Sequence, residues 1–359
     1  MSRDILLLAR YGSMGASSRI RSYQYIDALE SAGLRITRCP MFSDAYVAAR
    51  HRNRTRTAAA AMAGFARRAG QLLRAGRHAA LWVEYELLPW LPFVFERAFL
   101  NDRPVIVDYD DAVFHRYDRH PSALVRSLLG AKIDRIMHAA TVVVAGNDYL
   151  AARARDAGAT RIEIVPSVID IRRYRQKQTF ASESLAVGWI GSPSTIPYLR
   201  AIEPALRAAS DIRNLTITNV GGTPWFPPEL AVTNLDWSEA GEIDAMLKFD
   251  VGIMPLPDNP WTRGKCGYKL IQYMGCALPV IASPVGVNAQ IVEHGRSGFI
   301  ASSNADWVQA LRALATSPTL RESLGKAGFE KVARKYSLES TAPRLIALFE
   351  DALRVPRHA

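Results

Sequence analysis

The sequence predicts an α/β protein built from two doubly wound domains of similar size that face a central cleft. Three observations support this prediction. The chain has 359 residues, which is too long for one ordinary α/β core. Short apolar runs alternate with longer helical stretches, as in parallel sheets that are covered on both faces. The alternation pauses near residues 165–184 and then restarts, which indicates a boundary between two domains.

The first half of the chain contains a series of predicted strands and one clear early helix. Strands are expected at residues 5–9, 34–37, 80–83, 105–107 and 141–145, and a helix is expected at 22–32. The N-terminal domain is predicted to span residues 1–168. The polar, basic segment Arg172 to Ser184 is predicted to be the interdomain linker.

The same rhythm continues in the second half, where we predict a domain over residues 185–336. Strands are expected at 185–190, 215–220, 251–254 and 279–282, and helices at 198–209, 243–249, 268–275 and 305–316. Ser337 is suited to cap a last amphipathic helix within residues 337–359. Ligands of open α/β sheets bind at the carboxyl ends of strands, so two facing domains would suit a donor and an acceptor.

The net charge of +11 is unevenly distributed. Between Arg50 and His78 there is no acid, and the eight arginines are Arg50, Arg52, Arg54, Arg56, Arg67, Arg68, Arg74 and Arg77. With the strong helix formers between them, they could contact an anionic membrane surface or form a solvated helix face. Nucleic acid is not expected as a partner, because no nucleic-acid motif accompanies the charge.

Cysteine usage and hydropathy favour a cytoplasmic protein, and the basic stretch would allow a peripheral position on the inner face of the cell membrane. The three cysteines include no CxxC pair, which argues against a disulfide framework or a zinc site. The longest apolar stretch, at residues 87–94, is short and contains two prolines. We therefore expect neither a signal peptide nor a membrane span.

A glycine-containing loop follows the first predicted strand. Glycines between a strand and a helix let the backbone approach a ligand closely and expose amide groups at the helix start. The loop is not a GxGxxG fingerprint, and no P-loop motif occurs in the sequence, so a dehydrogenase or a P-loop enzyme is disfavoured. The candidate acceptor-binding residues are Gly12, Ser13, Met14, Gly15 and Arg19. A tight turn without a ligand is the alternative.

Three carboxylates, Asp108, Asp110 and Asp111, follow the predicted strand at 105–107. Carboxylates this close repel one another and usually meet cations or hydroxyl-rich ligands. The pattern is consistent with a divalent-metal site, with sugar binding or general-base catalysis by Asp110 or Asp111, or with a helix cap beside surface acids.

Two segments of the second half suit a diphosphate. Where its first strand turns into a helix, Gly191, Ser192, Ser194 and Thr195 combine hydroxyls with the amides of a helix start. Simple helix capping is the alternative there.

The densest signal lies in residues 255–269. Arg263, Lys265 and Lys269, together with two glycines, lead into a helix and would complement a diphosphate. Gln272 lies one turn beyond Lys269 and could reach ribose hydroxyls. A plain basic surface loop is the alternative.

Residues 265–282, 284–286 and 291–299 resemble the donor-site helix, glycine loop and following strand of the retaining, GT-B-fold glycosyltransferases of family 4. Residues 335–338 and the last helix also match, and residues 146–147 and 168–170 resemble the end of the family's first domain. The resemblance covers most of residues 140–350. It implies two Rossmann-like domains and a C-terminal helix that crosses back to the N-terminal domain.

The resemblance also implies donor contacts. The amides of Cys266, Gly267 and Tyr268 should face the sugar and phosphate. The segment that contains Trp237 and Ser238 resembles the loop that holds the nucleotide base.

One departure concerns two glutamates that the family usually carries eight positions apart. This chain has Gly264 and Gln272 at those places. Gln272 can still hydrogen-bond a ribose, but it supplies no negative charge, and Gly264 supplies no side chain. Contact with the donor sugar must then come from elsewhere, and the candidate catalytic residues are Lys265, Lys269, Asp110 and Asp111.

Taken together, the residues and the resemblance predict a hexosyltransferase that uses a nucleoside-diphosphate sugar. The acceptor is expected to be a glycan or a lipid-linked glycan in polysaccharide biosynthesis, and the transfer is expected to retain configuration. Preorganised cations would stabilise the leaving diphosphate, so neither a metal nor a further cofactor is expected. A sugar-nucleotide 2-epimerase of the same fold and a non-catalytic, basic tethering protein are the alternatives.

Overall fold

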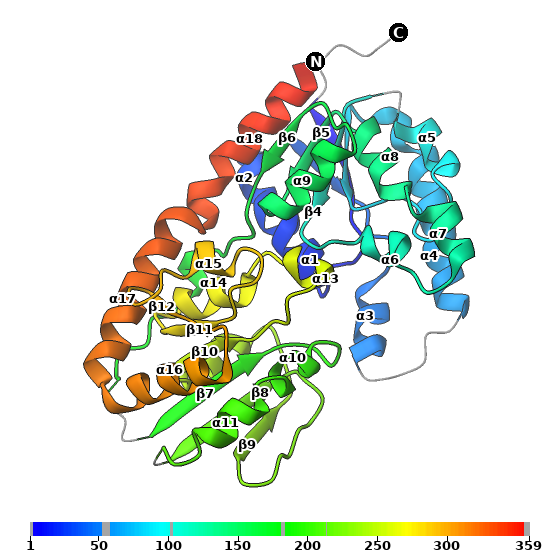
Figure 1. Ribbon diagram of the computed structural model, residues 1–359. Coiled ribbons are helices and arrows are strands. Elements are labelled where there is room, and N and C mark those ends of the chain that lie inside the picture. Colours follow the sequence, from blue (N-terminus) through cyan, green and yellow to red (C-terminus); the bar gives the residue numbers. More distant parts are fainter. Residues whose placement is uncertain (1–2, 52–57, 101–102, 181–183, 213, 355–359) are drawn as a thin grey trace. The chain divides into compact units, whose positions relative to one another are not determined.

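The computed structural model describes residues 3–51, 58–100, 103–180, 184–212 and 214–354 (Figure 1). The chain divides into two compact units, one formed by residues 1–167 with 341–359 and the other by residues 168–340. Each unit contains a six-stranded sheet. The predicted α/β fold class with two doubly wound domains is confirmed.

The sheet of the first unit is parallel throughout, in the order β2-β1-β3-β4-β5-β6. Its strands are β1 (Asp4–Leu8), β2 (Arg35–Arg38), β3 (Ala80–Glu84), β4 (Val105–Tyr109), β5 (Val142–Ala145) and β6 (Ile162–Ile164). The central strands β3, β4 and β5 are buried along their whole length, as a sheet covered on both faces requires. Strand β6 was not predicted from the sequence.

The helices of the first unit are α1 (Ala16–Arg21), α2 (Ile26–Ser31), α3 (Asp44–His51), α4 (Ala58–Leu73), α5 (Val94–Leu100), α6 (His115–Asp118), α7 (Ala123–Leu129), α8 (Lys132–Ala139) and α9 (Asp148–Asp156). Short 3₁₀ turns η1 (Tyr23–Tyr25) and η2 (Ala75–Arg77) accompany them. The helix predicted at 22–32 corresponds to η1 followed by α2, and the preceding helix α1 was not predicted. Helix α18 (Leu338–Arg354) contributes Phe349, whose ring lies 4.9 Å from that of Trp82 in β3.

The sheet of the second unit is also parallel, in the order β12-β11-β10-β7-β8-β9. Its strands are β7 (Leu185–Ile190), β8 (Leu215–Val220), β9 (Ala231–Leu235), β10 (Val251–Met254), β11 (Val280–Ala282) and β12 (Gly298–Ile300). Strands β7, β8 and β10 have the predicted bounds. Strands β9 and β12 lie at the two edges of the sheet and were not predicted.

The helices of the second unit are α10 (Ile196–Arg200), α11 (Glu203–Ala208), α12 (Glu242–Leu247), α13 (Pro260–Arg263), α14 (Tyr268–Gly275), α15 (Asn288–Ile291), α16 (Asn304–Thr316) and α17 (Pro318–Lys335), with a 3₁₀ turn η3 (Ile171–Arg173). The single helix predicted at 198–209 is two helices, and a proline in the first turn of α11 marks the restart. Helix α14 has the predicted bounds, and α17 was not predicted.

The basic segment expected as a linker, residues 172–184, belongs to the second unit. The ammonium of Lys177 lies 3.2 Å from the carbonyl of Leu247 and 3.4 Å from the carboxylate of Asp250. The carbonyl of Phe180 accepts a hydrogen bond from the buried guanidinium of Arg321. These contacts hold the described part of the segment against the second unit.

The arginines of the predicted basic stretch do not all lie in the same environment. Arg52, Arg54 and Arg56 lie outside the described residues. Arg68 in α4 is not part of a solvated or membrane-facing surface, because it is only 1% exposed and donates hydrogen bonds to the carbonyls of Ala9 and Cys39. Within the part of the chain that the structure describes, no helix combines the length and the apolar character needed to cross a membrane.

Candidate functional site

The predicted donor loop is a well-capped turn that leads into α14. Asn259 and Thr262 form a capping box at α13, and Gly267 is the N-cap of α14. Gly267 has φ +67°, and a Cβ atom added there would lie 2.2 Å from Cδ1 of Ile291. The backbone therefore approaches α15 more closely than any side chain would allow, as the predicted close approach to a ligand also requires.

The side chain of Trp189, near the end of β7, contacts two of the predicted donor residues. The ammonium of Lys269 lies 4.7 Å from the ring centroid of Trp189. Gly191 follows on the same strand end, and a Cβ atom added there would lie 2.0 Å from the ring of Trp189. Two predicted donor residues thus share one aromatic neighbour, which was not predicted. Lys265 makes a similar contact at 6.0 Å from the ring centroid of Trp261.

The hydroxyl residues after β7 form a local turn. The amide of Ser192 donates to Oγ1 of Thr195 at 3.0 Å, and the hydroxyls of Ser192 and Ser194 lie 2.9 Å apart. Ser192 and Ser194 are exposed. The capping alternative is not supported, because Thr195, the N-cap of α10, makes no side-chain capping hydrogen bond. The turn leaves two hydroxyl groups at the surface beside Gly191.

A buried carboxylate joins the predicted base loop to α14. Oε2 of Glu242 accepts a hydrogen bond from the indole of Trp237 at 2.9 Å. Oε1 of Glu242 accepts one from the amide of Gln272 at 3.2 Å, and the same amide lies 3.2 Å from the hydroxyl of Tyr174. Gln272 and Glu242 are 4% and 8% exposed. Sequence reasoning missed Glu242, although an acid in the first turn of a helix five residues after Trp237 was a usable signal.

A glycine brings the base loop to the end of β7. Gly221 has φ +76°, and a Cβ atom added there would lie 2.7 Å from Cβ of Trp237 and 2.6 Å from the carbonyl oxygen of Gly191. Through Gly221, Trp237 and Gly191 become neighbours. The structure therefore gathers the predicted residues Gly191, Trp237, Lys269 and Gln272 around the carboxyl ends of β7 and β8. This edge of an open sheet is where ligands bind.

Other predicted donor residues contribute less. The guanidinium of Arg263 forms two hydrogen bonds with Asp258, at 2.6 and 3.0 Å, and both side chains are at least half exposed. Its charge is therefore already matched by an acid. Ser238 accepts a hydrogen bond from the amide of Gly241, and Cys266 is buried. Tyr268 is hydrogen-bonded to Tyr174, whose pKa is raised chiefly by burial.

The three clustered carboxylates of the first unit have separate environments. Asp108 is buried and accepts two hydrogen bonds from Arg21, at 2.8 and 3.1 Å. Burial raises the pKa of Asp108 to about 6, and Arg21 opposes the rise. Asp110 is half-buried and accepts hydrogen bonds from Ser17, at 3.0 Å, and from Tyr85. Asp111 is half-buried. No three or more acidic, His or Cys side chains are grouped to hold a metal ion in the ranges described.

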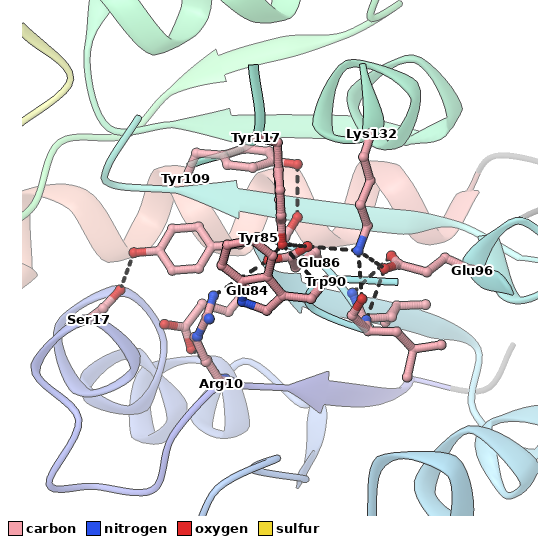
Figure 2. Close-up of polar contacts among 12 residues, drawn as sticks. Arg10, Ser17, Glu84, Tyr85, Glu86, Trp90, Glu96, Tyr109, Tyr117 and Lys132 are labelled. Carbon is pink, nitrogen blue, oxygen red and sulfur yellow. Dashed lines mark hydrogen bonds and ion pairs between the residues drawn. The ribbon is translucent and has the colours of Figure 1, made fainter. Parts of the chain in front are cut away.

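Tyr85 has a strained backbone held by buried charges. Its φ is +63°, and its hydroxyl meets Ser17 at 2.8 Å (Figure 2). The hydroxyl of Tyr109 donates to the carbonyl of Tyr85, and the buried Lys132 lies 2.8 Å from Glu86 and 2.7 Å from Glu96 (Figure 2). Such strain persists only where the surroundings fix it, and it concentrates at functional sites. Sequence reasoning missed Tyr85, because an ordinary tyrosine gives no sign of left-handed backbone.

The glycine loop after β1 is a tight turn built around an unpredicted acid, Asp44. The carboxylate of Asp44 accepts hydrogen bonds from the amide of Met14 at 2.8 Å and the hydroxyl of Ser13 at 3.1 Å. A Cβ atom at Gly12 would lie 2.3 Å from Oδ1 of Asp44. A Cβ atom at Gly15 would lie 2.3 Å from Cβ of Tyr11, and Arg19 donates to the carbonyl of Ser13. The glycines therefore serve the turn, and the amide of Met14 is already bound by Asp44.

Sequence comparison finds similarity between this chain and known glycosyltransferases. Residues 185–317, within the second unit, match the family model described as Glycosyl transferases group 1. A D-inositol 3-phosphate glycosyltransferase of Rhodococcus erythropolis is 26% identical over 250 residues, which cover 58% of this chain and 55% of that protein. One from Kribbella flavida is 24% identical, with 54% and 51% covered. The chain spans about half the length of the curated relatives it matches.

Solved structures share the fold over nearly the whole chain. Sucrose-phosphate synthase from Thermosynechococcus elongatus has a TM-score of 0.72 at 16% identity, and the match covers 97% of this chain and 98% of that one. Anabaena Alr3699/HepE in complex with UDP has a TM-score of 0.68 at 14% identity, with 98% and 100% covered. Two parallel α/β units of this kind define the GT-B class. The sequence matches support the narrower resemblance to family 4 glycosyltransferases over residues 185–317.

Proposed function

We propose that the protein transfers a hexosyl group, with retention, from a nucleoside-diphosphate sugar to a hydroxyl of a glycan or lipid-linked glycan. The observation that carries this proposal is the cluster at the carboxyl ends of β7 and β8. Trp237 offers a ring, Gln272 and Glu242 offer polar groups, and Lys269 offers a positive charge. Base, ribose and diphosphate need these three kinds of partner.

The chemistry follows from the charge that develops on the leaving diphosphate. Lys269 and Lys265 would stabilise it, and the N-terminus of α14 contributes a favourable dipole. Such contacts require no metal and no further cofactor. The Anabaena structures that contain UDP and UDP-glucose support a uridine-diphosphate sugar as the first donor to test.

On the acceptor side we assign Asp110, which Ser17 and Tyr85 hold in the first unit. It would orient the acceptor hydroxyl while the departing phosphate oxygen takes its proton. Under inversion, Asp110 or Asp111 would instead serve as the general base. Among the predicted acceptor residues of the glycine loop, Ser13 and Met14 are exposed and are the contacts we propose there.

A peripheral position on the cytoplasmic membrane face belongs to the same proposal, since a lipid-linked acceptor lies there. Its support is a set of exposed apolar and cationic side chains in α4 and the turn that follows it, namely Met62, Leu73, Arg67, Arg74 and Arg77. Exposed apolar and cationic side chains favour an anionic lipid surface.

The test is a thermal-shift screen with UDP, GDP, CDP, ADP and dTDP on the wild type and Lys269→Ala. A nucleotide at one hundred times its Kd should stabilise the protein by about 2.7 kcal/mol. Loss of Lys269 should weaken binding about 10- to 100-fold, because hydrogen bonds to charged groups contribute about 1.5–3 kcal/mol. Lys326→Ala, an exposed lysine of α17 that pairs with Glu322, is the matched control and should leave binding unchanged.

The outcomes separate the alternatives. If none of the five nucleotides raises the melting temperature, the assignment of the donor site is wrong and the non-catalytic tethering protein becomes the favoured alternative. If a donor sugar is epimerised when no acceptor is present, the 2-epimerase replaces the transferase.

A further inference from the structure

We infer that Glu242 supplies the carboxylate that binds the ribose hydroxyls of the donor nucleotide, in place of the charge that position 272 lacks. This inference rests on the proposed function. The family pattern predicts a glutamate at position 272, and the chain has a glutamine there. The structure places a carboxylate from another helix directly beside that glutamine.

The geometry fixes this carboxylate in one orientation. Glu242 is the first residue of α12, and each of its two oxygens accepts an N–H hydrogen bond, one from Trp237 at 2.9 Å and one from Gln272 at 3.2 Å. A carboxylate oxygen has two lone pairs, so each oxygen can accept a second hydrogen bond. Two oxygens held side by side match the neighbouring 2′- and 3′-hydroxyls of a ribose.

The order of groups around Glu242 matches the order of groups in a nucleoside diphosphate. Trp237, on one side, belongs to the loop predicted to hold the base. Gln272, on the other side, lies three residues from Lys269 on α14, and residues at this spacing share a helix face. Lys269 in turn contacts Trp189 at the end of β7. A ligand whose base lies at Trp237 and whose phosphates lie at Lys269 therefore passes its ribose by Glu242.

Charge explains why the substitution at position 272 is tolerated. A glutamate there would place a second carboxylate about 3 Å from Glu242, and two such groups repel. Glutamine instead donates an N–H to Glu242 and keeps one carboxylate at the site. In this chain the carboxylate at the site comes from α12, and the hydrogen bond between Gln272 and Glu242 joins it to α14.

The test compares UDP with 2′-deoxy-UDP, titrated calorimetrically into the wild type and Glu242→Gln. We expect the wild type to bind UDP about 10- to 100-fold more tightly, the range for a hydrogen bond to a charged group. Glu242→Gln should lose most of this preference, because UDP loses the contacts of both ribose hydroxyls whereas 2′-deoxy-UDP loses only that of its 3′-hydroxyl. Glu239→Gln, a partly exposed glutamate three residues earlier, is the matched control and should keep the preference.

Each outcome bears on a different statement. Equal binding of the two nucleotides by the wild type overturns the inference without any variant, and so does an unchanged preference in Glu242→Gln. If Glu242→Gln fails to fold, Glu242→Asp is measured in its place. It keeps the carboxylate on a shorter side chain, and it should also lose the preference for UDP. If neither nucleotide binds the wild type, the proposed donor function itself fails.

Discussion

Replacement of Gly267 by alanine should destabilise the protein by about 2–5 kcal/mol. The residue has φ +67°, and left-handed backbone costs an L-residue about 1–2 kcal/mol. The added Cβ atom would also lie 2.2 Å from Cδ1 of Ile291 and 3.3 Å from Cγ2 of Val287. Ile291 is 1% exposed, so its methyl group has little room to move, and overpacking of a buried site costs about 1–3 kcal/mol.

Urea unfolding followed by circular dichroism measures this loss, and the chain contains a matched control. Gly295 has φ +76°, but a Cβ atom there meets nothing within 4 Å. Gly295→Ala should therefore show only the backbone cost, about 1–2 kcal/mol. Ile291→Val removes the clashing Cδ1 atom, so in the Gly267→Ala background it should recover most of the contact cost as a favourable coupling energy. Equal losses for the two glycine variants, or no recovery, would refute the reasoning.

Two further predictions concern the first unit. Burial raises the pKa of Asp108 to about 6, so folding favours its neutral form. The stabilisation from this group is therefore complete below about pH 4 and is lost as the pH rises through 6. Urea titrations should show that the free energy of unfolding of the wild type falls over this range relative to that of Asp108→Asn. A difference between the two that does not change with pH would contradict the prediction. Tyr85→Phe removes a hydroxyl that holds Asp110, and it should slow sugar transfer about tenfold while the nucleotide-induced melting shift stays unchanged; an unaltered rate would exclude a positioning role.

Buried central strands were the most predictable part of the fold. Strands β7, β8 and β10 have the bounds expected from the sequence. Strands β7 and β10 are apolar and mostly buried, as a doubly covered sheet requires, whereas β8 contains two threonines and an asparagine and is only partly buried. The edge strands gave weaker patterns. Strand β9 alternates exposed and half-buried residues, and Glu163 interrupts the three residues of β6. Their pairing with a neighbouring strand is a tertiary contact that local hydropathy does not record.

Helix α1 was missed for a related reason. Residues 16–21 contain two serines and two arginines, so they gave little apolar signal. In the structure Arg21 is buried because Asp108, 87 residues away, accepts its hydrogen bonds. An arginine can face the interior only with such a partner, and a partner so distant in sequence cannot be read from a local pattern.

Partners distant in sequence were also missed at the candidate site, although the local motif there was predicted. The sequence predicted Gly267, Lys269 and Gln272 at the start of one helix, and it predicted that contact with the donor sugar must come from elsewhere because Gly264 has no side chain. The candidates for that contact were Lys265, Lys269 and the two aspartates, and Glu242 was not considered. A glutamine in the apolar run of α14 must itself satisfy two N–H donors, because an unpaired buried donor costs about 1–3 kcal/mol. The burial of Gln272 therefore requires an acceptor nearby, and Glu242 is one such acceptor.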